Sequence, residues 1–350
     1  MASIEKVHYN GGQSWGGHSF GSVCGIDLIP PTHKIPPPLP ILLPYHPFSA
    51  MAAAAPPLDK CAVVTGGNKG IGLEICRQLA AQGVIVVLTA RDHRRGLQAV
   101  EKLRQQGHDH LLFHHLDVSD PATIAALADL IKNQFGRLDI LVNNAGIVGA
   151  EVDFDVFETK LKAAGGDVEK MDPTGVMKQS YELAEECIKI NYYGAKTMTQ
   201  AFTPLLGLSN SPRIVNVSSS AGTLERLQNE WAKGVLGDAE SLTEERIDDV
   251  LSSFLKDFKD GQLAPKNWPP AVSAYKVSKA AMNAYTRMVA KNHPNWRVNC
   301  VCPGFVKTDI NGNSGNLTVE EGGESPVRLA LLPDDGPTGC FFDRKEISSF

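Results

Sequence analysis

From Cys61 onward, short apolar runs alternate with stretches that have the periodicity of amphipathic helices. A strand buried on both faces of a parallel sheet is hydrophobic throughout, and a helix joins it to the next parallel strand. The alternation therefore predicts an α/β fold, a doubly wound parallel sheet of about seven strands, in a single domain over residues 58–350. The predicted strands are CAVVT from Cys61, VIVVLT from Val84, LLFHHLDV from Leu111, LDILVNNAG from Leu138, RIVNVS at 213–218, RVNCVC at 297–302 and GCFFD at 339–343.

Residues 1–57 differ in composition and hold ten of the chain's 22 prolines and six of its glycines. Such a segment buries too little apolar surface to order itself, so we predict a disordered extension. It lacks the basic cluster and apolar core of a secretory signal and is poor in arginine, which favours a cytoplasmic protein. Two alternatives stay open: a cleavable plastid signal, and translation from Met51 with residues 1–50 as an upstream artefact.

Composition also limits the class of partner. The formal net charge is -5 and there is no run of lysine or arginine, which disfavours nucleic acid and anionic membrane surfaces. Seven cysteines form an odd number without a CxxC pair, so we expect reduced, mostly buried thiols. Proline interrupts the apolar run at 39–48, and no segment approaches the ~18 apolar residues of a membrane span. The expected partner is a small molecule.

A glycine-rich segment, TGGNKGIG at 65–72, follows the first predicted strand and opens directly into a helix. Glycines let the backbone turn tightly and approach a pyrophosphate, and a helix N-terminus supplies free amides and a positive dipole end. A tight turn without a ligand is the other interpretation. Because a strand precedes the motif and a helix follows it, the pattern favours dinucleotide binding in a Rossmann fold.

Tyr275 and Lys279 are four residues apart, which places both on one face of a helix. An ammonium beside a phenol lowers the phenol's pKa, so we predict a tyrosine that exchanges a proton near neutral pH. The alternative is a surface pair without chemistry.

These motifs, together with Asn143-Asn144-Ala145-Gly146, resemble the short-chain dehydrogenase/reductase family over residues 60–350. KINYYG at 189–194, VCPGFVKTD at 301–309 and FFDRK at 341–345 are similar to plant carbonyl reductases of the neomenthol dehydrogenase and salutaridine reductase type. The resemblance implies that Ser219 binds the substrate oxygen, with Ser218 and Ser220 as open alternatives. It also implies that Asn191 holds a lysine-bound water, where the alternative is a helix-surface amide.

The catalytic residues predicted in this way are Asn191, Ser219, Tyr275 and Lys279. The strand-end pair Asp117-Val118 resembles the family's adenine contact, and a helix cap before Pro121 is the other interpretation of Asp117. The predicted cofactor-binding residues are Gly66, Asn68, Lys69, Gly70, Ile71, Gly72, Arg91, Arg95, Asp117, Val118, Asn143, Ala145, Gly146, Tyr275, Lys279, Pro303, Gly304, Val306 and Thr308.

The choice of cofactor depends on the charge near the adenosine ribose. About twenty residues beyond Gly72, where an NAD enzyme presents a carboxylate to the ribose, this chain has Arg91. Lys69 and Arg95 can converge on the same point, and we interpret Asp92 as a helix N-cap rather than a ribose ligand. The sequence therefore predicts NADPH, against the alternative that the arginines are solvated helix-start charges.

Between Ser219 and Tyr275 lie 55 residues, many more than the resemblance predicts. Ser241 and Glu244 form a potential capping box. The apolar stripe that follows predicts one inserted amphipathic helix within residues 223–270: Ile247, Val250, Leu251, Phe254, Leu255 and Phe258. By resemblance to monomeric carbonyl reductases this insertion covers a dimerisation face, so we expect a monomer.

Residues 309–325 are glycine-rich up to a second capping box at Thr318 and Glu321, and we predict a mobile lid there. Four clustered histidines, at 108, 110, 114 and 115, alternate faces and lack a ligand carboxylate at helical spacing, so no metal site is predicted. The leading hypothesis is NADPH-dependent reduction of a ketone or aldehyde, with a terpenoid or alkaloid substrate suggested by resemblance. The alternative is a dinucleotide-binding regulator that has lost catalysis.

Overall fold

The structure, a computed structural model, describes residues 60–166 and 170–350. These residues lie in one contact unit. The predicted disorder of residues 1–57 and the plastid-signal and Met51 alternatives fall outside the described residues, as does Cys24.

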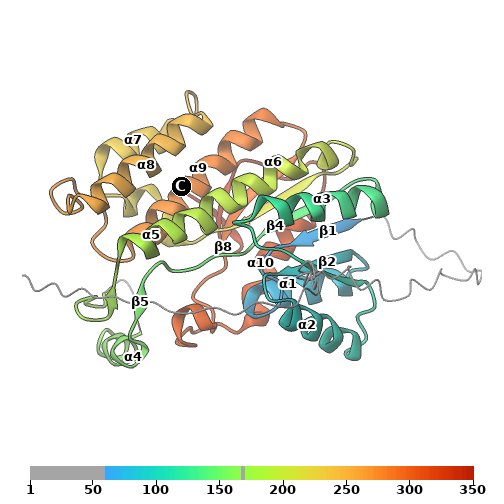
Figure 1. Ribbon diagram of the computed structural model, residues 1–350, viewed down its shortest axis with the longest axis horizontal. Coiled ribbons are helices and arrows are strands. Elements are labelled where there is room, and N and C mark those ends of the chain that lie inside the picture. Colours follow the sequence, from blue (N-terminus) through green and yellow to red (C-terminus); the bar gives the residue numbers. More distant parts are fainter. Residues whose placement is uncertain (1–59, 167–169) are drawn as a thin grey trace, which may run out of the picture. The chain divides into compact units, whose positions relative to one another are not determined.

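The main sheet has eight strands in the order β10-β9-β8-β7-β4-β1-β2-β3, and every neighbouring pair is parallel except β10 and β9. Figure 1 labels β1, β2, β4 and β8 of this sheet among the helices that cover it. The doubly wound fold is thus confirmed, with one more strand than the predicted seven, because the chain turns back after β9 to form an antiparallel edge. The main strands are β1 (Cys61–Val64), β2 (Ile85–Ala90), β3 (Leu111–His115), β4 (Ile140–Asn143), β7 (Arg213–Val217), β8 (Arg297–Cys302), β9 (Phe341–Asp343) and β10 (Glu346–Ser348). A separate two-stranded antiparallel sheet contains β5 (Glu151–Val152) and β6 (Met177–Lys178).

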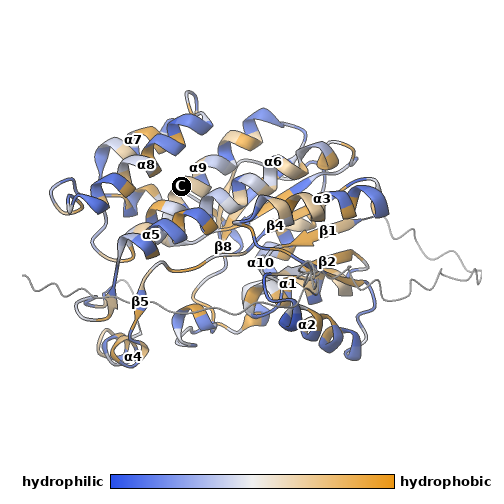
Figure 2. Cartoon of the chain, viewed as in Figure 1, coloured by the Kyte–Doolittle hydropathy of each residue, from blue (hydrophilic) through white to orange (hydrophobic). Residues whose placement is uncertain are grey.

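Alternate residues of the central strands enter two different cores. In β1, Ala62 and Val64 belong to a cluster with α1, α2 and α10, while Cys61 and Val63 belong to a cluster with α3, α5, α6, α8 and α9. Both faces of the sheet are therefore covered, which explains why the strands are apolar throughout (Figure 2). The helices are α1 (Gly70–Ala81), α2 (His93–Gln105), α3 (Pro121–Phe135), α4 (Phe154–Ala163), α5 (Tyr181–Ile188), α6 (Ala195–Leu206), α7 (Glu230–Gly237), α8 (Glu244–Lys259), α9 (Ser273–Asn292) and α10 (Val319–Ala330).

Strands β1 and β4 are neighbours at the point where the strand order changes direction. From β1 the chain continues outward through β2 and β3, and from β4 it continues through β7 and β8 on the other side. Loops that follow such a pair diverge and leave a crevice at the carboxyl ends of the strands. The glycine-rich segment follows β1 and residues 144–146 follow β4, so the topology brings these two predicted motifs together.

Two aspartates begin the helices next to this crevice. Asp92 caps α2, where its side chain accepts from the Arg95 amide at 2.9 Å, so the N-cap prediction is confirmed. Asp120 caps α3 in the same way, with Pro121 in the first turn. The alternative of Asp117 as the cap is wrong, because its carboxylate accepts instead from the backbone and hydroxyl of Ser119.

The insertion contains two helices, α7 and α8, rather than the one predicted. Helix α8 is capped by Thr243, which accepts from the Arg246 amide, and the Ser241 capping box is wrong. Leu242 before the cap and Ile247 in the second turn are both buried in one cluster, which is the pattern of a hydrophobic staple and places the cap at residue 243. The predicted stripe is otherwise confirmed, since its first four residues are buried and its last two pack against the same cluster.

Helices α7 and α8 are tied to the main body by buried and half-buried polar groups. Lys196 on α6 lies 2.8 Å from Asp248 and 3.1 Å from Glu244, both on α8. Arg287 on α9 donates to the last carbonyls of α7. The insertion therefore packs on α5, α6 and α9 rather than extending into solvent.

The predicted lid, residues 309–325, comprises the short helix η4 (Asp309–Asn311), a loop, and the start of α10. Thr318 and Glu321 form the predicted capping box of α10. Helix α10 packs on α1: a Cβ at Gly323 would lie 2.8 Å from Glu74. Only residues 312–317 form a loop, and its motion stays a prediction.

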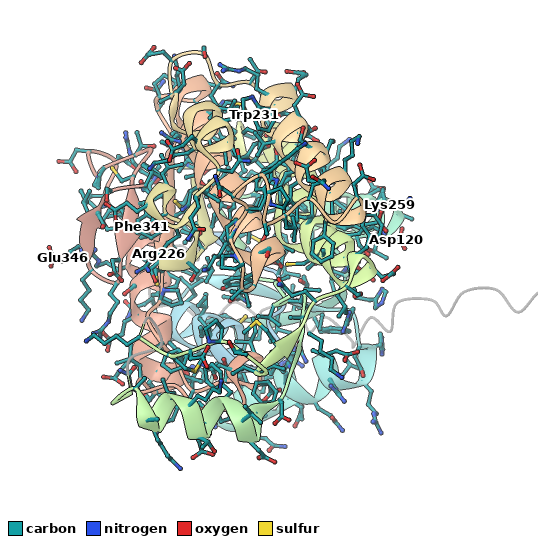
Figure 3. All side chains as sticks on the ribbon, turned by 90° about the vertical axis from the view of Figure 1, so that its left-hand side faces the viewer. Asp120, Arg226, Trp231, Lys259, Phe341 and Glu346 are labelled. Atoms are coloured by element: carbon teal, nitrogen blue, oxygen red, sulfur yellow. The ribbon has the colours of Figure 1, made fainter. Side chains whose placement is uncertain are left out.

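Six cysteines lie in the described residues, all are free, and five are buried. Cys300 and Cys302 pack with Phe341, which confirms their expected place in the core. No described helix is both long and apolar enough to cross a membrane. Figure 3 shows Glu346 of β10 and Asp120 after β3 at opposite sides, as expected for residues at the two edges of one sheet.

Candidate active site

Tyr275 and Lys279 lie one turn apart on α9, as their spacing predicts. The Lys279 Nζ lies 5.7 Å from the centroid of the Tyr275 ring and donates to the Val217 carbonyl at 2.8 Å, where β7 ends. Lys279 is buried and Tyr275 is half-buried. Helix α9 thus presents both side chains to the carboxyl end of β7.

The three consecutive serines after β7 have different environments. Ser218 is buried and donates to the Asn283 side chain at 2.6 Å. Ser220 begins a short helix, η2 (Ser220–Gly222). The Ser219 side chain lies close enough to the Tyr275 phenol to lower its pKa, and it accepts from the Ala221 amide at 3.2 Å. Of the three, Ser219 is the one that the structure brings to Tyr275.

Burial is the largest influence on the pKa values of both Tyr275 and Lys279. Burial raises the pKa of the Tyr275 phenol, and the hydrogen bond from Ser219 lowers it only in part. Burial also lowers the pKa of Lys279 to about 8. The predicted lowering of the phenol's pKa is therefore not seen in the protein alone, because an apolar environment disfavours both charged forms, and the contribution of Lys279 to a phenolate stays a prediction.

Asn191 is fully buried in a π-helical turn, η1 (Lys189–Gly194), between α5 and α6. Its side chain accepts from the Ile147 amide at 2.8 Å and donates to the Ile147 carbonyl at 2.9 Å and to Ser278 at 3.0 Å. The alternative of a helix-surface amide is therefore wrong. A Cβ at Gly146 would lie 3.2 Å from Asn191 Oδ1 and 3.6 Å from Lys279 Nζ, so these three residues are neighbours.

The glycine-rich loop has the conformation that its sequence requires. Gly66 and Gly70 have φ of 64° and 54°, in the left-handed region that favours glycine. Gly72 has no room for a side chain, since a Cβ there would lie 2.3 Å from the Gly66 carbonyl oxygen. Asn68 and Ile71 are half-buried in the same turn, and Lys69 precedes α1 without a side-chain cap.

Two residues absent from the predicted site hold this loop against the end of β4. Asn144 donates to the carbonyls of Thr65 and Gly66 at 2.9 and 3.2 Å, and Thr65 Oγ1 accepts from the amides of Asn144 and Ala145. Asn143 instead lies on the face of the sheet that α6 covers and donates to Asn216 and to Thr199 of α6, so its side chain does not reach the crevice. The second asparagine of the motif, rather than the first, has its side chain at the glycine-rich loop.

The remaining predicted contacts come from the segment after β8. Pro303 and Val306 are buried, Gly304 has φ of 88°, and Thr308 lies with its methyl group 3.3 Å from where a Cβ of Gly70 would be. The segment 303–308 therefore closes over the start of α1.

Charged side chains surround the carboxyl end of β2. Arg91 is exposed there, and Arg95 is paired with Asp92 at 3.5 Å. Asp117 is half-buried; burial raises its pKa, but hydrogen bonds from Ser119 and the charge of Arg91 outweigh burial, so that the pKa is lowered overall. Lys69 is paired with Asp309 at 2.6 Å, so its predicted convergence with the arginines stays a prediction. Val118, beside Asp117, packs on Gly194, and a Cβ at Gly194 would lie 2.8 Å from the Val118 side chain.

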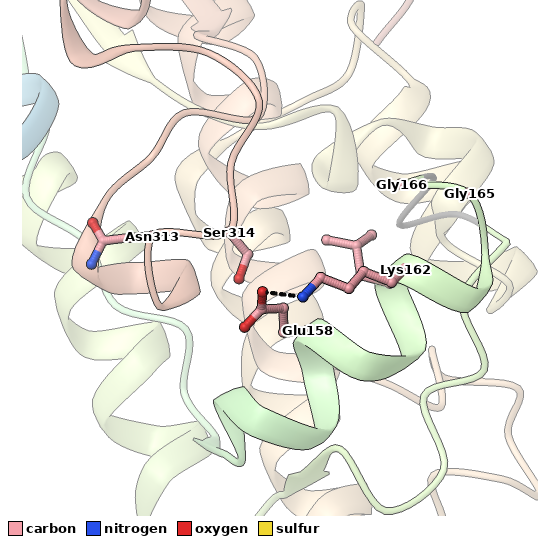
Figure 4. Close-up of a pocket in the computed structure, with 7 residues that line it drawn as sticks. Glu158, Lys162, Gly165, Gly166, Asn313 and Ser314 are labelled. Carbon is pink, nitrogen blue, oxygen red and sulfur yellow. Dashed lines mark ion pairs between the residues drawn. The ribbon is translucent and has the colours of Figure 1, made fainter.

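A cavity of about 470 Å³ lies between α4 and the loop after η4 (Figure 4). It is lined by Glu158, Leu161, Lys162, Gly165, Gly166, Asn313 and Ser314, and Glu158 pairs with Lys162 at 2.6 Å. None of the predicted catalytic residues lines it, so the cavity is not the reaction site. Among the described residues no cluster of histidine, cysteine or carboxylate side chains could hold a metal ion.

The comparisons with known proteins agree with this geometry. A family model described as short chain dehydrogenase matches residues 60–230 and 263–317. The chain belongs to the short-chain dehydrogenase/reductase family. It is therefore an oxidoreductase. The gap between the two matched ranges, 231–262, contains most of α7 and all of α8.

Three relatives place the chain within the short-chain dehydrogenase/reductase family. A (+)-neomenthol dehydrogenase of Arabidopsis thaliana is 60% identical over 293 residues, which cover 83% of this chain and 97% of the relative. The structure of salutaridine reductase from Papaver somniferum matches with a TM-score of 0.76 and 54% identity, covering 81% of this chain and 99% of that one. A human protein named carbonyl reductase [NADPH] 1 is 37% identical over 300 residues, 83% of this chain and 98% of the relative. The predicted plant type is confirmed.

Proposed function

We propose that the chain is an NADPH-dependent reductase that converts a ketone or aldehyde to the alcohol. The observation that carries the proposal is the meeting of Ser219, Tyr275 and Lys279 at the end of β7, next to the loop that begins α1. The names of the relatives, a neomenthol dehydrogenase and a salutaridine reductase, suggest a terpenoid or alkaloid carbonyl compound.

The crevice fits a dinucleotide phosphate cofactor. The left-handed turns at Gly66 and Gly70 let a pyrophosphate approach the backbone at the start of α1, and the absent side chain at Gly72 lets α1 begin directly against this loop. Arg91 and Arg95 offer guanidinium groups to a 2′-phosphate, while the nearby carboxylate of Asp92 is engaged as a helix cap. When bound, NADPH supplies the hydride to the carbonyl carbon.

The chain's own groups would act on the carbonyl oxygen. Ser219 Oγ and Tyr275 Oη would hydrogen-bond that oxygen as negative charge develops, and Tyr275 Oη would deliver its proton there. Because burial raises its pKa, Tyr275 holds that proton at neutral pH until a stronger base, the alkoxide, is next to it. Lys279 would stabilise the phenolate that remains, and Asn191 would hold Gly146 and Ile147 beside it.

Two further properties belong to the proposal. The packing of α8 against α5, α6 and α9 supports a monomer, because this insertion occupies faces that would otherwise be free for a second copy. Light scattering of the purified protein tests this, and a stable dimer would refute it. The cytoplasmic location expected from the sequence stays a prediction that tissue fractionation would test.

The reductase proposal is tested by the decay of NADPH absorbance with a panel of cyclic terpenoid ketones, alkaloid ketones and simple aldehydes. We expect turnover of at least one class, with one alcohol formed per NADPH consumed. Tight NADPH binding without turnover across the whole panel would instead support the regulator hypothesis.

A further inference from the structure

The segment that carries Ser219 is held at both ends by one side chain. Asn283 accepts from the Ser218 hydroxyl through Oδ1 at 2.6 Å and donates through Nδ2 to the Gly222 carbonyl at 3.0 Å. Both hydrogen bonds are buried, and Asn283 itself is 2% exposed. The amide thus bridges the residue before Ser219 and the residue three positions after it.

The same segment lies directly on the helix backbone. A Cβ at Gly222 would lie 2.6 Å from the Lys279 backbone carbon and Cβ, so the chain approaches α9 as closely as glycine allows. The segment that carries Ser219 is therefore held by a backbone contact at Lys279 and by the side-chain amide of Asn283, one helical turn further on. We call this pair of hydrogen bonds from Asn283 the clamp. Its hydrogen bond with the Ala221 amide lies within its own segment and does not fix it relative to α9.

The clamp shares a helix face with the reacting groups. Tyr275, Lys279 and Asn283 follow one another at intervals of four residues on α9, which places them in one row. A single rigid helix thus carries the phenol, the ammonium and the amide that sets the position of the serine. The distance between Ser219 Oγ and Tyr275 Oη then depends on Asn283.

We propose that Asn283 is a positioning residue that holds Ser219 in register with Tyr275 for the reduction. This inference rests on the proposed function, in which both hydroxyls bind the same carbonyl oxygen. Asn283 does not touch the substrate in this account; it acts through the 218–222 segment. A displacement of about 1 Å at a catalytic group can cost roughly a hundredfold in rate.

The test is a double-mutant cycle between Asn283→Leu, which removes both hydrogen bonds and keeps the branched shape of the side chain, and Ser219→Ala. Asn283→Leu should lower kcat by about ten- to a hundredfold while the Kd for NADPH, from protein fluorescence, stays at the wild-type value. In the Ser219→Ala background the same change should cost little more, because there is no longer a serine to position.

Thr286→Val is the matched control. Thr286 is one turn further on α9, fully buried, and bonded to Asn216 and to the Met282 carbonyl, so its loss removes buried hydrogen bonds without touching the serine segment. It should keep the wild-type kcat at a comparable loss of Tm. If Asn283→Leu does not fold, Ser218→Ala enters the same cycle with a smaller loss expected in the same direction.

Equal kcat values for Asn283→Leu and Thr286→Val would overturn the proposal, as would losses that multiply in the double variant. Ser219→Ala at the wild-type rate would remove the role of Ser219 itself, and this proposal with it. That outcome is separate from failure of the reductase function, which would appear as a wild type without turnover.

Discussion

Replacement of Arg91 by alanine tests how the chain distinguishes NADPH from NADH. Arg91 is exposed at the end of β2, and its charge contributes to lowering the pKa of Asp117, which follows the neighbouring strand β3. A charge-assisted hydrogen bond is worth about 1.5–3 kcal/mol. Because Arg91 is solvent-exposed, screening favours the lower end of this range. A loss of about 1.4 kcal/mol is a tenfold weaker Kd.

We therefore expect Arg91→Ala to raise the NADPH Kd by roughly one power of ten, and to leave the NADH Kd nearly unchanged. The assay is fluorescence titration with each cofactor, followed by kcat/KM with both. Arg94→Ala is the matched control, since Arg94 is an exposed neighbour in the first turn of α2 that we do not assign to the phosphate. The wild-type preference for NADPH should also weaken at high salt. Equal losses for both cofactors, or a wild type that prefers NADH, would refute the reasoning.

Three further predictions concern stability and the loop. The pKa of Lys279 is about 8 in the folded protein, against an ordinary lysine value of 10.5, so the burial of its charge destabilises the folded state fully below pH 8 and less as the pH rises between these two values. Denaturant melts should show the free energy of unfolding of the wild type rising by up to about 3 kcal/mol relative to that of Lys279→Met over that interval. A constant difference would contradict this. Thr243→Ala should cost about 1 kcal/mol through loss of the α8 cap, whereas Ser241→Ala should cost less, and the reverse order would show that the cap is misplaced. Gly72→Ala should abolish cofactor binding in fluorescence titration, because a Cβ at 72 collides with the backbone of its own loop. Gly234→Ala, which has open space around it, should bind the cofactor normally. Normal binding by both variants would show that the conformation of the glycine-rich loop does not depend on the absence of a side chain at 72.

The sheet could be predicted from the sequence because its signal is local. Each parallel strand is a short apolar run, and its neighbours along the chain are helices, so burial on both faces is visible in the residues themselves. The antiparallel β10 could not be predicted in this way, since Glu346–Ser348 is exposed and has no apolar pattern. Edge strands that bury little surface leave little trace in a sequence.

The site shows where local patterns stop being sufficient. The choice between Asn143 and Asn144 can be made from the sequence, because strand periodicity puts Asn143 on the same face as Leu141, and that face of the sheet is covered by α6. The cap at Thr243 is harder to predict from the sequence, since a cap at Ser241 and a cap at Thr243 both fit, and the burial of Leu242 decides between them. The raised pKa of Tyr275 could not be predicted from the sequence, because it depends on burial by segments far apart in the chain.

The central claim is that Tyr275 donates the proton that completes the reduction. Its most direct test is the rate of NADPH oxidation with a turned-over ketone for Tyr275→Phe, beside Tyr285→Phe as a control. Tyr285 is a buried phenol on the same helix, packed against Tyr192. We predict that Tyr275→Phe lowers kcat by about a hundredfold or more and still binds NADPH, while Tyr285→Phe keeps its rate. Full activity of Tyr275→Phe would contradict the account.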